Sequence, residues 1–272
     1  MESKRLFDCI EHQLTKFPQE AMFAAKENGA WKKYATTEVA STVNALSAGL
    51  LSLGLSGNDF TPEGSDKIAI ISSNRPEWLM ADMATQQIGV IWVPVYPTTN
   101  PLELTFILND ASVQYMFASN QDLYNKVMSI KDKVPCLKEV YTFDHIPGAK
   151  HWSELCLKDA DLLQQVDVIK KTIPVEQVAT FIYTSGTTGT PKGVMLTHHN
   201  IYFNLQSGKN SFPFPDKPDQ KVLSFLPLNH IFEKVASYIY MYSGMSIYYA
   251  ESMETIGDNL KEVSPDAFST VP

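Results

Sequence analysis

Apolar positions along the first 180 residues follow two alternating patterns. Spacings of three and four residues predict helices over residues 2–16, 36–53, 76–88 and 121–133, with another helix beginning at Pro101. Short apolar runs between them predict strands over residues 67–72, 90–95, 113–118 and 139–143. Strands that alternate with helices favour a parallel sheet with helical crossovers, so we expect layered α/β sheets with helices on their faces.

Two regions of this first part depart from the alternation. Asn28 and Gly29 separate the apolar residues 21–25 from residues 31–34, which predicts a β-hairpin near the start of the chain. Residues 146–174 are more polar and predict a connection with one or two short helices.

The remaining residues predict a second series of elements around a polar segment. Strands at residues 181–183 and 194–196 flank this segment, and a helix starts near His199. A surface loop at residues 211–220 is followed by predicted strands at 221–226, 246–250 and 268–271 and helices at 230–242 and 255–263. We therefore predict one α/β subdomain over residues 1–180 and the start of a second over residues 181–272.

The polar segment, residues 183–194, carries the strongest chemical signal. It holds three glycines, four threonines, a serine and a lysine, with no acidic residue. Glycines let a backbone approach a ligand closely, and hydroxyls with backbone N–H groups can surround phosphate oxygens. The segment therefore predicts a nucleotide phosphate loop. Its candidate binding residues are Thr184, Ser185, Gly186, Thr187, Thr188, Gly189, Thr190 and Lys192.

Two familiar phosphate loops do not fit this segment. A P-loop requires glycine before its lysine and serine or threonine after it, but Pro191 and Gly193 occupy those positions. The Rossmann fingerprint fails because no glycine stands two residues before Gly186. A flexible Thr/Gly-rich surface loop is the plain alternative.

Composition narrows the class of protein. The chain has 272 residues, 44% of them hydrophobic, and a formal net charge of −8, which favours a folded core and argues against nucleic-acid binding. Its three cysteines are widely spaced, as in reduced intracellular proteins, and its first ten residues lack the apolar core of a signal peptide. We expect a cytoplasmic protein, with peripheral membrane contact left open.

The polar segment resembles the T-S-G-T-T-G-x-P-K-G loop of the adenylate-forming superfamily, at every fixed position. The segment at residues 227–234 is similar to P-L-x-H-[IV]-F-E-R of the long-chain acyl-CoA synthetase branch, with His230 and Glu233 matched and Lys234 in place of arginine. Residues 73–78 and 94–98 resemble that branch as well, in a capped helix start and a proline turn.

The resemblance implies ATP, Mg²⁺ and coenzyme A as reactants with a fatty acid. Lys192 and His230 would be catalytic, His230 and Glu233 would border the acid, and Thr184 would offer its hydroxyl to Mg²⁺. From the residues of this segment alone, packing against aromatic neighbours explains His230 better than a role in binding. A tyrosine-rich stretch at residues 238–249 is interpreted as core, with an acyl tunnel as the minor alternative, and His198 and His199 as helix-start residues.

Later motifs that the resemblance implies are missing from these 272 residues. They include an adenine-binding turn, a ribose-binding aspartate, a hinge and a C-terminal domain with a catalytic lysine. We therefore expect the N-terminal part of a long-chain fatty acid–CoA ligase, inactive by itself, binding ATP weakly or not at all, with a mobile phosphate loop. Two alternatives stay open: a ligase for an aromatic or amino acid, and a non-catalytic nucleotide-binding scaffold. Oligomeric state is not indicated.

Overall fold

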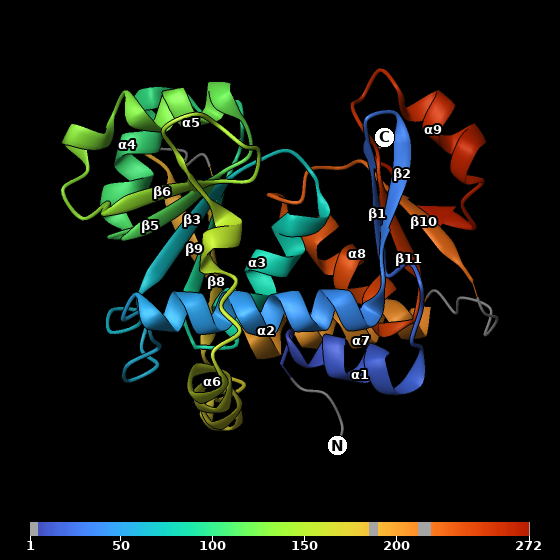
Figure 1. The fold of residues 1–272 in the computed structure, drawn as a ribbon, viewed down its shortest axis with the longest axis horizontal. Coiled ribbons are helices and arrows are strands. Elements are labelled where there is room, and N and C mark those ends of the chain that lie inside the picture. Colours follow the sequence, from blue (N-terminus) through green and yellow to red (C-terminus); the bar gives the residue numbers. More distant parts are fainter. Residues whose placement is uncertain (1–4, 185–189, 212–218, 272) are drawn as a thin grey trace. The chain divides into compact units, whose positions relative to one another are not determined.

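A computed structural model describes residues 5–184, 190–211 and 219–271. The chain divides into two compact units, each formed from separate stretches (Figure 1). Unit 1 comprises Met1–Thr42, Asn74–Met80 and His199–Pro272, and unit 2 comprises Val43–Ser73 and Ala81–His198. The chain passes between the units inside α2 (Thr36–Ser52), just before and inside α3 (Pro76–Gln86), and after the first residue of α7 (His198–Ser211).

Unit 2 is built on a seven-stranded sheet, counted over the described residues. Its strands, in spatial order, are β7 (Lys150–His151), β6 (Glu139–Thr142), β5 (Tyr115–Ala118), β3 (Lys67–Ile71), β4 (Ile91–Val95), β8 (Val178–Thr184) and β9 (Lys192–Thr197). Neighbouring strands are parallel except for β8 and β9, which are antiparallel. Every residue of β3, β4 and β5 is buried, as the unbroken apolar runs predict.

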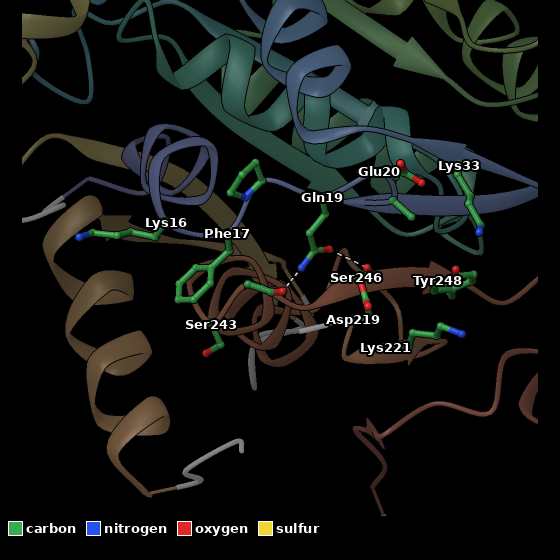
Figure 2. Close-up of a pocket in the computed structure, with 13 residues that line it drawn as sticks. Lys16, Phe17, Gln19, Glu20, Lys33, Asp219, Lys221, Ser243, Ser246 and Tyr248 are labelled. Atoms are coloured by element: carbon green, nitrogen blue, oxygen red, sulfur yellow. Dashed lines mark hydrogen bonds between the residues drawn. The ribbon is translucent and has the colours of Figure 1, made fainter. Parts of the chain in front are cut away.

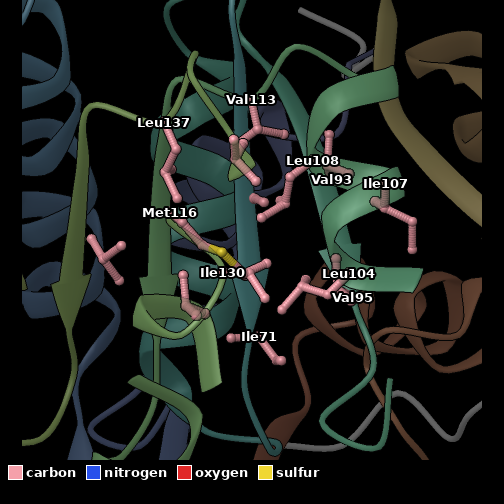
Figure 3. Close-up of a cluster of buried hydrophobic side chains, with 14 of the residues drawn as sticks. Ile71, Val93, Val95, Leu104, Ile107, Leu108, Val113, Met116, Ile130 and Leu137 are labelled. Carbon is pink, nitrogen blue, oxygen red and sulfur yellow. The ribbon is translucent and has the colours of Figure 1, made fainter. Parts of the chain in front are cut away.

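Two short helices cover one face of this sheet, and their starts follow from the local sequence. The side chain of Asn100 caps α4 (Pro101–Asp110), and that of Asn120 caps α5 (Gln121–Met128). Apolar residues of both helices pack on β3, β4, β5 and β6 in one buried cluster (Figure 3). Unit 2 also holds η1 (Lys131–Lys133), η2 (Trp152–Leu155), α6 (Ala160–Thr172) and the later parts of α2 and α3.

Unit 1 contains a five-stranded sheet in the described part of the chain. Its order is β12 (Ala267–Phe268), β10 (Lys221–Ser224), β11 (Ser246–Tyr249), β1 (Phe23–Glu27) and β2 (Ala30–Tyr34). All pairs are parallel except the β1–β2 hairpin. Helix α9 (Ile256–Val263) packs on β1, β10 and β11, while α8 (Ile231–Tyr242) contacts β10, β11 and α1 (Asp8–Lys16).

The layered α/β class is confirmed, and several elements differ from the sequence expectation. The predicted helix over residues 121–133 is two segments, because α5 ends at Met128 and η1 follows. The connection at residues 146–174 holds a 13-residue helix, α6, which is longer than expected. The predicted strand at 268–271 is the two-residue β12.

The division into units also differs from the expected boundary at residue 180. That position lies inside β8, which pairs with β4, so the strands around the polar segment complete the first sheet. The early hairpin β1–β2 instead joins strands from the end of the chain. Pairing between segments far apart in sequence leaves no local signal in the hydrophobic pattern. The order of elements along the chain therefore predicted one subdomain on each side of residue 180.

Helix α2 touches its neighbour through a glycine. A Cβ atom added to Gly49 would lie 1.8 Å from the carbonyl oxygen of Leu155, whereas one added to Gly257 in α9 meets no described atom within 4 Å. We expect Gly49→Ala to lower the free energy of unfolding by about 1–3 kcal/mol, because the backbone of η2 must move. Gly257→Ala should raise it by about 0.5–1 kcal/mol, since alanine favours helix more than glycine does. Urea unfolding of both variants would measure this, and equal shifts would contradict the close approach.

Candidate functional site

The polar segment closes a β-hairpin in unit 2. Thr184, the last residue of β8, pairs directly with Lys192, the first residue of β9. Of the predicted phosphate ligands, Thr184, Thr190 and Lys192 are described and are exposed. Ser185, Gly186, Thr187, Thr188 and Gly189 lie outside the described residues, as does the expectation that the loop is mobile.

The base of this hairpin is held firmly by the sheet beneath it. The hydroxyl of Thr180 donates to the carbonyl of Trp92, 2.8 Å away, in the neighbouring strand β4. The hydroxyl of Tyr183 donates to Asp110 at 2.5 Å, and burial together with Asp110 raises the pKa of this tyrosine. Gly193 lies opposite Tyr183, where a Cβ would come 3.1 Å from the ring. The two ends of the loop are therefore fixed even though its middle is not described.

Lys192 places a positive charge at the mouth of the hairpin. Its side chain is exposed, and no carboxylate of the described residues forms an ion pair with it. An exposed ammonium group attracts an anion, and the exposed hydroxyls of Thr184 and Thr190 belong to the same hairpin. The phosphate-binding role of this hairpin stays a prediction, because five of its eight candidate residues lie outside the described residues.

His230 occupies the N-cap of α8 in unit 1. It follows β10, whose carboxyl end lies beside the carboxyl end of the parallel strand β11, the edge where open α/β sheets bind ligands. Its Nδ1 accepts a hydrogen bond from the backbone N–H of Phe232 at 3.2 Å. A neutral imidazole that accepts through Nδ1 carries its proton on Nε2. The exposed ring therefore presents an N–H donor to solvent.

Glu233 and Lys234 are enclosed within the same unit. Glu233 is 1% exposed, and the hydroxyl of Ser224 donates to its Oε1 at 2.6 Å. Its Oε2 accepts from no described donor, and burial raises the pKa of the carboxyl to about 7. The ammonium group of Lys234 lies 5.6 Å from the centroid of the Trp78 ring, a cation–π distance. The predicted contact of Glu233 with substrate stays a prediction, because its side chain is shielded from solvent.

The sequence-predicted site residues thus fall into two sets. Thr184, Thr190 and Lys192 share the hairpin of unit 2, whereas His230 and Glu233 share the start of α8 in unit 1. Sequence reasoning missed Ser224, the partner of Glu233. The available signal was a hydroxyl directly after the apolar pair Val222 and Leu223.

The other singled-out residues are structural. The five tyrosines of the stretch at residues 238–249 are all buried, which matches the core interpretation. Helix α7 begins at His198, as expected for residues at a helix start. Within the described ranges, no group of three or more His, Cys, Asp or Glu side chains could hold a metal, and no helix is long and apolar enough to cross a bilayer.

A hollow of about 750 Å³ lies elsewhere in unit 1, between the α1–β1 connection and the β10–β11 region (Figure 2). Gln19 crosses it, donating to the carbonyl of Gly244 and accepting from the hydroxyl of Ser246. None of the sequence-predicted site residues that the structure describes lines this hollow. Its size therefore gives no support to the predicted chemistry, and the hairpin of unit 2 and the start of α8 in unit 1 remain two separate sets of candidate residues.

Comparison with known proteins identifies the family. The model of the AMP-binding enzyme family matches residues 10–272, which includes both the hairpin and the start of α8. The chain belongs to the AMP-binding enzyme family.

Family members with similar sequences include long-chain ligases. The long-chain-fatty-acid–CoA ligase FadD15 of Mycobacterium bovis is 26% identical over 94% of this chain and 41% of its own length. The peroxisomal long chain acyl-CoA synthetase 6 of Arabidopsis thaliana is 33% identical over 89% of this chain and 34% of its own length. The chain thus spans about two fifths or less of these relatives.

A solved structure supports the fold at low sequence identity. The anthranilate CoA ligase AuaEII, in complex with anthranoyl-AMP, is 17% identical, with a TM-score of 0.79 over 97% of this chain and 49% of that one. Identity this low indicates a shared fold, and the acid named for that ligase is its own.

Proposed function

We propose that this chain carries the phosphate-binding and acid-activating part of a long-chain fatty acid–CoA ligase. Family membership and the two long-chain relatives support the class of reaction. The single observation that carries the proposal is Lys192, which is exposed at the hairpin closed by its pairing with Thr184 and forms no ion pair with a described carboxylate.

The proposed reaction has two steps. In the first, a fatty-acid carboxylate oxygen attacks the α-phosphorus of ATP, and the bond to the β-phosphate oxygen breaks, giving acyl-adenylate and pyrophosphate. In the second, the sulfur of coenzyme A attacks the acyl carbon and displaces AMP, while the thiol proton leaves to solvent. AMP is a far better leaving group than the oxygen of a free carboxylate, which is why the acid is activated first.

In this proposal the hairpin holds the phosphates of ATP in place and offsets their negative charge. Pyrophosphate gains negative charge as it departs, and Lys192 with the hydroxyls of Thr184 and Thr190 would offset that charge. Ser185, Gly186, Thr187, Thr188 and Gly189 would supply further donors. His230 would donate its Nε2–H to an oxygen of the carboxylate or the α-phosphate. Glu233, which is buried in the first turn of α8, would help to hold the acid-binding residues in place.

Mg²⁺ fits this site only as an ion that is bound mainly by the nucleotide phosphates. Among the described residues near the loop, Thr184 offers an exposed hydroxyl, and no cluster of carboxylates stands ready to hold a resident ion. Magnesium in such sites is bound largely by substrate phosphates and waters, with few protein ligands. Thr184 is therefore proposed as its protein ligand, and the ion would neutralise phosphate charge.

The setting we propose is the cytoplasm, with peripheral contact to membranes where long-chain acids reside. Three cysteines that form no disulfide support a reducing compartment. Fatty acid, ATP and coenzyme A are the proposed small-molecule partners, and the net charge of −8 disfavours nucleic acid.

A second candidate keeps the chemistry and changes the acid. The similarity of fold to an anthranilate CoA ligase supports an aromatic acid as the alternative substrate. The third candidate, a nucleotide-binding scaffold without chemistry, has only the burial of Glu233 in its favour.

An exchange assay separates these candidates. We expect the complete protein to exchange labelled pyrophosphate into ATP in the presence of palmitate, and not with anthranilate or the common amino acids. Exchange with anthranilate alone would favour the second candidate. Binding of ATP with no exchange for any acid would favour the scaffold, and neither binding nor exchange would refute all three.

A further inference from the structure

The loop that carries His230 is fastened to a segment much earlier in the sequence. Residues 225–230 connect β10 to α8, and the backbone N–H of His230 donates to the carbonyl of Pro227 at 2.9 Å. The stretch Asn74–Met80 belongs to the same compact unit as this loop. Two of its side chains bind the loop immediately before His230.

The first of these side chains is Asn74. Its Nδ2 donates to the carbonyl of Leu226 at 2.7 Å, and its Oδ1 accepts from the backbone N–H of Leu228 at 2.9 Å. One amide group thus satisfies a backbone acceptor and a backbone donor two residues apart. Only a side chain with both a donor and an acceptor can make this pair of bonds, so aspartate and leucine cannot replace it.

The second side chain is Trp78. Its indole N–H donates to Oδ1 of Asn229 at 3.1 Å, and both residues are fully or almost fully buried. Asn229 is the residue directly before His230. A buried hydrogen bond between two side chains resists displacement, because breaking it leaves polar groups without partners.

The same asparagine connects the loop to Glu233. Nδ2 of Asn74 lies 3.4 Å from the hydroxyl of Ser224, and that hydroxyl donates to Glu233. Asn74 is therefore connected to the chain on both sides of His230. It binds Leu226 and Leu228 before the histidine directly, and it reaches Glu233 after the histidine through the hydroxyl of Ser224.

We infer that Asn74 is a positioning residue for His230. It fixes the loop at residues 226–228 so that the N-cap ring of His230 presents its Nε2–H in one direction. The inference rests on the proposed function, in which that N–H meets an oxygen of the acid or the nucleotide. Trp78 holds Asn229 in the same way and supports the same geometry.

A double-mutant cycle in the complete protein tests this inference. Pyrophosphate exchange with palmitate would be measured for the wild type, Asn74→Ala, His230→Ala and the double variant. We expect each single change to lower the exchange rate about 10- to 100-fold, the range that small misplacements of a reacting group produce. The double variant should be no slower than His230→Ala, because a loop without its histidine has nothing left to position.

Asn259 provides the matched control. Its side chain is buried, accepts from the backbone N–H of Glu251 at 3.1 Å and donates to the carboxylate of Glu251 at 2.9 Å, in the same unit but on α9. Asn259→Ala also removes an asparagine that holds a loop, so it should lower the unfolding midpoint comparably. Its exchange rate should stay within twofold of the wild type, and its effect should multiply with that of His230→Ala.

Several outcomes would overturn the inference, and they differ from failure of the proposed function. If Asn74→Ala exchanged pyrophosphate at the wild-type rate, Asn74 would serve stability alone. The same would follow if the effects of Asn74→Ala and His230→Ala multiplied fully in the double variant. No exchange by the wild type with any acid would instead refute the proposed function. Normal exchange by His230→Ala would remove the role of His230 and with it the reason for positioning it.

Discussion

Replacing Lys192 by alanine in the complete protein should lower the rate of acyl-adenylate formation by about 10²–10³-fold. This is the loss seen when a single preorganised group that stabilises transition-state charge is removed. Lys192 is exposed at the mouth of the hairpin, and no described carboxylate competes for its charge. Pyrophosphate exchange and single-turnover formation of acyl-adenylate would measure the loss.

The control for this change is Lys171→Ala. Lys171 is an exposed lysine in the last turn of α6, in the same unit and outside the hairpin. Both variants should unfold at wild-type temperature, because neither lysine is buried, and only Lys192→Ala should lose exchange. Equal activity of Lys192→Ala and the wild type would remove the basis of the proposed function.

Replacing Glu233 by glutamine should stabilise the protein at pH 8 by about 3 kcal/mol and have little effect at pH 5. Burial raises the pKa of this carboxyl from 4.5 to about 7 in the folded state. The folded state therefore holds the proton more tightly than the unfolded state, and stability falls as pH rises between these two values. Above pH 7 the full cost of a buried charge applies, about 1.4 kcal/mol for each unit of pKa difference.

Glutamine keeps the shape of Glu233 and can still accept the hydrogen bond from Ser224, but it carries no charge to bury. Urea unfolding at pH 5, 6, 7 and 8 would measure the difference between the variant and the wild type. Glu20→Gln is the control, since it makes the same chemical change at an exposed position. A gain from Glu233→Gln that did not grow with pH would contradict a raised pKa.

The features that sequence alone predicted are local ones. The buried strands of unit 2 follow from apolar runs, and the starts of α4 at Pro101 and of α5 at Gln121 were predicted from the sequence around them. The pairing of β8 with β9 was predictable for the same reason, because the two strands are nearly consecutive in sequence.

The features that sequence did not predict depend on distant pairing. Nothing within residues 23–34 indicates that β1 will pair with β11, since a half-buried hairpin pairs equally well with many edges. The role of Asn74 was hidden for a similar reason. An asparagine before Pro76 is well explained as a local helix start, and only its bonds to Leu226 and Leu228 show a further task.

The discontinuous sheet of unit 1 has a consequence for synthesis on the ribosome. Strand β1 pairs in register with β11, with Phe23 opposite Ile247. Strand β1 therefore cannot form this native pairing until β11 has been synthesised. At ordinary translation rates this delay is roughly 10–40 seconds, during which the apolar face of the β1–β2 hairpin has no native partner. The seven-stranded sheet needs no strand beyond β9 and can close sooner. Nascent chains stalled before β11 should therefore bind holding chaperones through the first forty residues, and chains stalled after it should be released.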